Sequence, residues 1–233
     1  MKITKVEAIY IRQPEVKEQC DSGQDALLVR IETDAGITGI GEVDSHPLAV
    51  KGVIEGPFSH TATTGLAQVL IGEDPFETEK LWYKMYRANI YSGRRGIAIH
   101  AMSGIDMALW DIKGKALKLP VWKLLGGGFH DKVRCYASSL WGPTPDKTRE
   151  LASRYQDQGF TAIKFGWDPM GQDEKTDIAL VREARRGMGK DCDLLIDAGL
   201  VWDAKTAIQR AHAFEEFDPF WLEEPLRPDD YEG

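Results

Sequence analysis

The stretch Leu194-Leu195-Ile196-Asp197-Ala198, followed further along the chain by Phe220-Trp221-Leu222-Glu223-Glu224-Pro225, decides the predicted fold. Each stretch is a short apolar run that ends in a carboxylate, and residues 203–217 between them have a helical pattern. A strand, a crossover helix and a second strand form parallel neighbours in one sheet. We therefore expect Asp197 and Glu223 at the carboxyl ends of adjacent parallel strands. Active sites of barrels built from such units form on that face, and two converging carboxylates suit a hard divalent cation such as Mg²⁺.

The same alternation of strand and helix begins near residue 132. The predicted strands cover residues 133–139, 161–165, 193–197 and 220–223, and the predicted helices cover residues 145–158, 173–186 and 203–217. Such alternation predicts a parallel sheet with helices outside it. A complete barrel of this kind has eight strands in roughly 250 residues. Four strands therefore predict an incomplete α/β (TIM-type) barrel over residues 129–233.

The first 128 residues have a different pattern and form a predicted α+β domain. Alternating apolar residues predict an antiparallel meander of three strands, over residues 3–12, 26–33 and 37–43. Helical patterns follow over residues 47–55, 60–70, 96–117 and 120–125, together with one that begins at Asp74-Pro75. Asp74 is a predicted N-cap, because proline follows it in the first turn and Glu77 lies three residues on.

Composition excludes several classes of function. The chain has 233 residues, 42% hydrophobic and 28% charged, with a formal net charge of -8. Binding to nucleic acid or to a membrane surface needs a basic face, so neither partner is expected. No apolar run approaches the roughly 18 residues of a membrane helix, and the N-terminus lacks the apolar core of a signal peptide. Three cysteines, Cys20, Cys135 and Cys192, show no metal-binding spacing, which predicts reduced thiols and a cytoplasmic location.

Four motifs occur in a fixed order along the chain. They are Ala101-Met102-Ser103-Gly104-Ile105-Asp106-Met107-Ala108-Leu109-Trp110-Asp111, Gly159-Phe160-Thr161-Ala162-Ile163-Lys164, Ile196-Asp197-Ala198 and Trp221-Leu222-Glu223-Glu224-Pro225. Their order and spacing resemble the enolase superfamily, in its mandelate racemase and muconate-lactonizing branch. The resemblance covers the whole chain. Residues 1–128 resemble the N-terminal capping domain of that family, and residues 129–233 resemble the first half of its barrel.

The resemblance implies a metal-dependent reaction. The family holds Mg²⁺ with three carboxylates at the ends of three successive strands, and Asp197 and Glu223 match the first two. The third would lie on the next strand, which these residues do not contain. In the family the metal holds a substrate carboxylate, a Lys or His base removes the neighbouring proton, and the metal stabilises the enediolate. The α-proton of a carboxylate is very weakly acidic, so the reaction needs concentrated positive charge.

Lys164 matches the first lysine of the family's Lys-x-Lys motif, and the second is usually the base. That position is Gly166 here, a residue without a side chain that could take a proton. Lys164 acts in its place or supplies only charge. Racemisation needs bases on both faces of the substrate, so the loss of one favours a one-base reaction such as dehydration of an acid sugar. The remaining base of the family is a histidine from a later strand.

The resemblance also suggests residues around the metal ligands. Glu224 matches a second acid that commonly follows the ligand, whereas Gly199 stands where the family often has asparagine. The loop over residues 16–24 and the segment Asp44-Ser45-His46-Pro47 match places where the family closes over substrate. We therefore include His46 and Trp141, which follows the first barrel strand, as candidate contacts for a small carboxylate substrate.

Several alternatives remain open from the sequence. The chain is a fragment of an acid-sugar dehydratase, a truncated paralogue that serves as a non-catalytic binding module, or one part of a barrel that a second chain completes. A racemase or epimerase of the same family would need a second base that these residues do not supply. The resemblance also implies a homo-oligomer.

Overall fold

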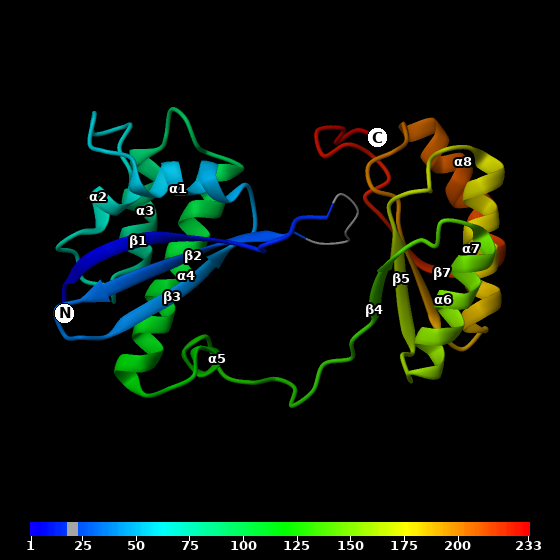
Figure 1. The fold of residues 1–233 in the computed structure, drawn as a ribbon, viewed down its shortest axis with the longest axis horizontal. Coiled ribbons are helices and arrows are strands. Elements are labelled where there is room, and N and C mark those ends of the chain that lie inside the picture. The colour runs from blue at the N-terminus through cyan, green and yellow to red at the C-terminus, as the bar shows by residue number, and fades with distance from the viewer. Residues whose placement is uncertain (18–22) are drawn as a thin grey trace. The chain divides into compact units, whose positions relative to one another are not determined.

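The computed structural model describes residues 1–17 and 23–233. Cys20 and part of the predicted loop over residues 16–24 lie outside the described residues. The chain divides into two compact units, Met1–Asp131 and Lys132–Gly233 (Figure 1). The boundary expected from sequence, between residues 128 and 129, falls in the segment that leads from the last helix of the first unit to the first strand of the second.

The first unit is an antiparallel sheet covered by helices. Its described strands are β1 (Ile3–Arg12), β2 (Asp25–Thr33) and β3 (Thr38–Val43), in the order β1-β2-β3. Its described helices are α1 (Pro47–Glu55), α2 (Leu66–Leu70), α3 (Thr78–Ala88), α4 (Ile97–Leu117) and α5 (Val121–Leu124). Alternate residues of β2, such as Leu27 and Val29, are fully buried in one core with Ile105 and Leu109 of α4. The predicted meander is confirmed.

Two helix predictions in this unit are wrong at their starts. Asp74 does not cap α3, which begins at Thr78. Its carboxylate instead accepts a hydrogen bond from the backbone N–H of Phe76, at 3.0 Å, and closes a local turn around Pro75. The helix predicted from residue 60 is only α2, because His60 and Thr63 form an isolated bridge and the helix begins after Gly65.

The second unit is a four-stranded parallel sheet in the order β4-β5-β6-β7. Its described elements are β4 (Ala137–Leu140), α6 (Pro145–Asp157), β5 (Ala162–Gly166), α7 (Glu174–Met188), β6 (Asp193–Asp197), α8 (Ala204–Phe214), the 3₁₀ turn η1 (Glu215–Phe217) and β7 (Pro219–Glu223). Figure 1 shows α6, α7 and α8 on one face of this sheet. The predicted fold class, an α+β domain followed along the chain by a partial barrel of strand-helix units, is confirmed.

The sequence pattern explains which face the helices cover. Ile163 and Phe165 of β5 and Leu194 and Ile196 of β6 are fully buried in the core between sheet and helices. Successive side chains of a strand point to opposite faces. Lys164 of β5 and Asp197 of β6 therefore point away from the helices. The opposite face of the sheet therefore carries the polar groups of interest.

The predicted strand over residues 133–139 is too long at its start, since β4 begins at Ala137. The guanidinium of Arg134 donates hydrogen bonds to Thr161 and ion-pairs with Asp193 at 2.6 Å. The segment before β4 is therefore held by a side chain and not by a strand ladder.

Capping residues fix where each helix of this unit starts. Thr144, Asp173 and Asp203 each accept a hydrogen bond from the backbone N–H three residues on, at the start of α6, α7 and α8. Such caps satisfy backbone donors that a helix leaves unpaired. They separate each helix sharply from the strand end before it, and the loops between are short. Among the described residues, no helix has the length and apolar character to cross a membrane.

Candidate active site

The structure brings Asp197, Glu223 and Lys164 together at the carboxyl ends of β5, β6 and β7. Asp197 and Glu223 are register partners in the β6–β7 ladder. The Lys164 ammonium lies between them, 3.2 Å from Asp197 Oδ2 and 2.9 Å from Glu223 Oε1. Lys164 pairs with Leu195, two residues before Asp197, so its long side chain runs forward to the carboxylates. Two carboxylates thus converge on one cationic group.

Burial and charge act against each other at Lys164. Burial disfavours the ammonium, but hydrogen bonds to Glu223 and Asp197 and their negative charges outweigh it and raise the pKa of Lys164. The lysine is therefore a fixed positive charge in this arrangement. Asp197 itself is only 4% exposed, and its second oxygen, Oδ1, accepts a hydrogen bond from the backbone N–H of Gly199 at 3.0 Å.

Glu224 follows Glu223 directly and has a left-handed backbone, with φ of 34°. Burial, and then the neighbouring charges of Asp197 and Glu223, raise the pKa of Glu224. The carbonyl of Glu224 accepts a hydrogen bond from Leu200 N–H at 2.8 Å, which continues the contact between the two strand ends beyond the ladder. Glu224 therefore adds a third carboxyl group beside the pair.

Gly166 is the register partner of Asp197 on β5. A Cβ on residue 166 would lie 2.8 Å from the Cβ of Asp197 and 3.1 Å from its Cγ. Real Cβ atoms essentially never approach so closely, so the absence of a side chain at 166 makes room for the Asp197 carboxylate. The glycine that departs from the Lys-x-Lys pattern is thus part of the site.

The donor set fits a hard divalent cation. The oxygens of Asp197 and Glu223 already converge on one positive group, and Mg²⁺ prefers oxygen ligands supplied by one or two carboxylates. Within residues 1–17 and 23–233, no group of three His, Cys, Asp or Glu side chains is arranged to hold a metal. Asp197 and Glu223 thus stay two predicted ligands, whereas an octahedral Mg²⁺ takes about six.

The two candidate substrate contacts, His46 and Trp141, belong to different units. His46 is exposed at the start of α1, in the first unit, and its side chain makes no capping hydrogen bond. Trp141 is buried and stacks on Phe165, with ring centroids 5.1 Å apart. Its Nε1 has no hydrogen-bond partner among the described residues. Trp141 therefore lies in the core on the helix-covered side of the sheet, with Phe165. The roles of His46 and Trp141 in substrate binding stay predictions.

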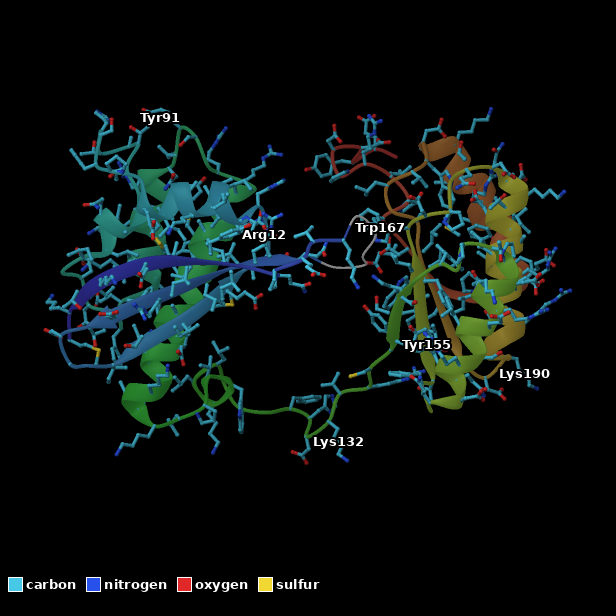
Figure 2. All side chains as sticks on the ribbon, in the orientation of Figure 1. Arg12, Tyr91, Lys132, Tyr155, Trp167 and Lys190 are labelled. Carbon is cyan, nitrogen blue, oxygen red and sulfur yellow. The ribbon has the colours of Figure 1, made fainter. Side chains whose placement is uncertain are left out.

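Trp167, directly after Gly166, was not among the candidates from sequence. It lies at the carboxyl end of β5 (Figure 2). The end of the neighbouring strand carries Asp197, and the Trp167 side chain is 53% exposed. The backbone N–H of Trp167 donates a hydrogen bond to the carbonyl of Asp197 at 3.4 Å. The available signal in the sequence was the Gly166-Trp167 pair at the strand end. Without the distances from Trp167 to the neighbouring strand end, this pair indicates only an ordinary turn.

Comparison with known families decides the relationship. Residues 8–126 match the model of the mandelate racemase / muconate lactonizing enzyme N-terminal domain, and residues 147–233 match that of the enolase C-terminal domain-like family. This chain belongs to the mandelate racemase and muconate lactonizing enzyme family of the enolase superfamily. The family is Mg²⁺-dependent, and the resemblance expected from the motifs is confirmed.

Relatives within this family act on acid sugars. The chain is 32% identical to the L-rhamnonate dehydratase of Saccharopolyspora erythraea, over 89% of this chain and 49% of the relative. It is 36% identical to the 3,6-anhydro-alpha-L-galactonate cycloisomerase of Streptomyces coelicolor, over 90% and 56% respectively. The chain thus spans about half the length of the curated relatives it matches.

A solved structure shows the same architecture with a metal. The mandelate racemase/muconate lactonizing protein of Paracoccus denitrificans PD1222, complexed with magnesium, is 30% identical to this chain with a TM-score of 0.83. The match covers 97% of this chain and 59% of that protein.

Proposed function

We propose that this chain supplies the capping domain and part of the active site of an Mg²⁺-dependent acid-sugar dehydratase, a lyase. One observation carries the proposal. The Lys164 ammonium bridges Asp197 and Glu223 at the ends of three adjacent parallel strands. Dehydratases among the relatives support the same reaction class.

The proposed reaction removes the proton beside the substrate carboxylate and expels the β-hydroxyl group as water. Asp197 and Glu223 would hold the metal, with Glu224 beside them. A bound Mg²⁺ supplies positive charge for the substrate carboxylate and for the charge that develops when the α-proton leaves. Lys164 adds a second positive charge at the same strand ends and orients the substrate carboxylate.

The described residues do not complete this machinery. Further metal ligands must come from substrate, water or groups outside these residues, because Asp197 and Glu223 are two ligands only. A one-base dehydration also needs a proton acceptor, and Gly166 has none. We expect a third carboxylate and a histidine base from outside these 233 residues, in the same polypeptide or a partner chain. The whole enzyme is expected to be a cytoplasmic homo-oligomer.

A second candidate is a cycloisomerase of acid sugars, favoured by the 36% identical relative from Streptomyces coelicolor. A cycloisomerase would use the same residues to bind the substrate carboxylate. It would differ from a dehydratase in what happens to the rest of the substrate. A racemase or epimerase would need a second base at the place of Gly166. A non-catalytic truncated paralogue would have no metal-dependent thermal stabilisation and no activity with any partner chain.

The protein is first isolated from its own source, and its intact mass is compared with the 26.1 kDa of this chain. The test then uses that protein and recombinant variants of the same length. Each is incubated in D₂O with Mg²⁺ and a panel of aldonic and aldaric acids. Nuclear magnetic resonance follows exchange of the α-proton and formation of the dehydrated 2-keto product. We expect the exchange and the product to require Mg²⁺ and to be lost in Asp197→Asn. Both should persist in Glu150→Gln, whose exposed carboxylate pairs with Lys147 alone among the described residues. If the full-length protein shows no metal-dependent exchange with any of these acids, the dehydratase proposal is wrong.

A further inference from the structure

Trp167 and Gly199 form a second pair of close neighbours beside the metal-binding carboxylates. A Cβ on residue 199 would lie 3.5 Å from Cδ2 and Cε3 of the Trp167 indole. The six-membered part of the indole therefore lies against the bare backbone of Gly199. Gly199 also donates its N–H to Asp197 Oδ1. The indole thus lies against the residue whose backbone N–H holds the carboxylate of Asp197.

The placement of Trp167 brings little gain to the folded state. More than half of its surface is exposed, so it contributes only part of the burial that an indole offers. Its backbone is left-handed, with φ of 69°, which is uncommon for a bulky residue. Residues kept in such conformations cluster at ligand-binding sites.

The same conformation recurs at the other strand ends of the site. Among the described residues, five that are not glycine have a positive φ, and three of them are Trp167, Leu200 and Glu224. These follow β5, β6 and β7 respectively, within three residues of the strand end. The left-handed turns therefore concentrate at the edge that carries Asp197 and Glu223, and Trp167 is the aromatic member.

On this geometry, and resting on the proposed function, we infer that Trp167 is a substrate-positioning residue. The exposed part of the indole forms a flat apolar wall next to the carboxylate-binding end of the site. A polyhydroxylated acid presents a row of C–H groups along its carbon chain, and such a row packs on an aromatic face. Trp167 thus favours sugar acids of about five or six carbons, whose row of C–H groups covers the wall, over short hydroxy acids, which cover little of it.

The experiment measures binding and turnover separately in the full-length, Mg²⁺-loaded protein. Trp167→Phe keeps a flat face and Trp167→Ala removes it, whereas Trp122→Ala removes an equally exposed tryptophan from α5 in the other unit. Calorimetry gives the Kd of a six-carbon aldonic acid and of lactate. Steady-state kinetics give kcat and KM for the best sugar acid. Titration with Mn²⁺ reports whether the metal ligands are intact.

We expect Trp167→Ala to raise Kd and KM for the sugar acid about tenfold, the size of one lost aromatic contact. Trp167→Phe and Trp122→Ala should stay within about threefold of the unchanged protein on the same scale. Lactate binding and Mn²⁺ affinity should not change in any variant. A Kd for the sugar acid in Trp167→Ala within twofold of the unchanged protein would overturn the inference.

The two proposals fail in different ways. If the unchanged protein binds sugar acids but never exchanges the α-proton, the dehydratase proposal fails. The ratio of the Kd values of Trp167→Ala and the unchanged protein still tests the role of Trp167 in binding. If the protein turns over sugar acids and Trp167→Ala binds them equally well, only the inference about Trp167 fails. If the Mg²⁺-loaded protein binds no acid of the panel, both are rejected.

Discussion

Gly166 leaves free the space next to the Asp197 side chain, since a Cβ on residue 166 would lie 2.8 Å from the Cβ of Asp197. At the position where the family usually carries its base, this chain has no side chain, and the Asp197 carboxyl group lies against the bare backbone. The side chain that could accept a proton and the present position of Asp197 exclude each other. The proposed one-base reaction agrees with this packing.

Gly166→Ala should therefore disturb the metal ligand. We expect a loss of about 1–3 kcal/mol in the free energy of unfolding, as for an overpacked core. Mn²⁺ affinity should fall roughly tenfold as Asp197 moves. Gly52→Ala is the matched control, because nothing lies within 4 Å of an added Cβ in α1. It should stabilise the protein by about 0.5–1 kcal/mol. Equal Mn²⁺ affinity in Gly166→Ala and the unchanged protein would contradict this account.

The pattern of the sequence was enough to predict the parallel sheet and the end of it at which Asp197 and Glu223 meet. Apolar runs ending in Asp197 and Glu223, with a helix between them, specify parallel strands in register, and the ladder pairs these two residues directly. The helix starts were less predictable. Asp74 satisfies every local rule for a cap, yet its carboxylate prefers the nearer N–H of Phe76.

The roles of Gly166 and Gly199 could not be read from sequence. In the chain both residues are only departures from a family pattern. Each becomes meaningful through a distance across strands, to Asp197 for Gly166 and to the Trp167 indole for Gly199. Such distances depend on register and on the path of the backbone, which single-residue patterns do not encode. The position of Trp167 was missed for the same reason.

Lys164→Met should separate the electrostatic roles of the lysine. Without the ammonium, Asp197 and Glu223 lose the cation that now lies between them. We expect the thermal stabilisation by Mg²⁺ to be larger in this variant than in the unchanged protein, because the metal relieves the repulsion. Turnover should fall roughly 10²–10³-fold, as when a preorganised charge is removed. Differential scanning fluorimetry with and without Mg²⁺ measures the first effect.

Lys147→Met is the control for Lys164→Met, since Lys147 makes an exposed ion pair with Glu150 on α6. Such pairs contribute little, so neither the Mg²⁺ effect nor turnover should change. If Lys164→Met and Lys147→Met respond alike to Mg²⁺, the ammonium does not occupy the metal-binding position.

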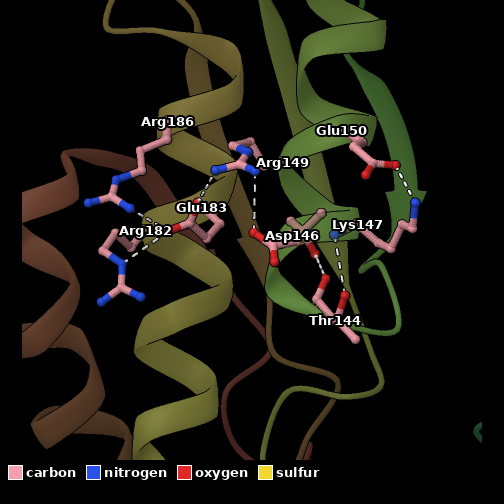
Figure 3. A network of polar contacts seen from close by, with 9 residues as sticks. Thr144, Asp146, Lys147, Arg149, Glu150, Arg182, Glu183 and Arg186 are labelled. Atoms are coloured by element: carbon pink, nitrogen blue, oxygen red, sulfur yellow. Dashed lines mark hydrogen bonds and ion pairs between the residues drawn. The ribbon is translucent and has the colours of Figure 1, made fainter.

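We expect acid to weaken the ion pairs of Glu183, which connect α6 and α7. Its side chain is buried, and its carboxylate lies 2.7 Å from Arg186, 3.2 Å from Arg182 and 3.4 Å from Arg149 (Figure 3). Burial alone would raise the pKa of Glu183, but the hydrogen bonds and charges of these arginines hold it below its ordinary value of 4.5. A lowered folded-state pKa gives stability that is present above the unfolded value and lost as the pH falls through the folded one.

Glu183→Gln should therefore be less stable than the unchanged protein at pH 7, by about 1–3 kcal/mol. The difference should shrink as the pH falls below the ordinary carboxyl value towards about pH 3. Urea denaturation of the second unit's signal at both pH values measures this. Glu150→Gln, at an exposed carboxylate of α6, should show a small and constant difference. A gap for Glu183→Gln that widens on acidification would refute the assignment.

The buried pair of Asp177 and Arg210 joins α7 to α8 and also holds the loop that follows Trp167. Asp177 is fully buried, and Oδ2 accepts a hydrogen bond from Arg210 Nε at 2.9 Å while Oδ1 accepts one from Gly171 N–H at 2.7 Å. Removal of Arg210 leaves the Asp177 carboxylate buried without its cation, and removal of Asp177 leaves the buried Arg210 with the exposed Glu174 at 3.3 Å. Breaking such a buried pair costs about 3–5 kcal/mol. We expect that loss in Asp177→Ala and a similar one in Arg210→Met, measured by urea denaturation.

The double variant Asp177→Leu with Arg210→Met should lose much less than the sum of the two single changes, because it leaves no unpaired charge. The loop should still be released, since no acceptor remains for Gly171 N–H. Sugar-acid affinity should therefore fall in the double variant even where stability recovers, as Met170 N–H and the Trp167 carbonyl belong to the same turn. A double variant that recovers stability and binds sugar acids unchanged would show that the pair supports the helices but not the position of Trp167.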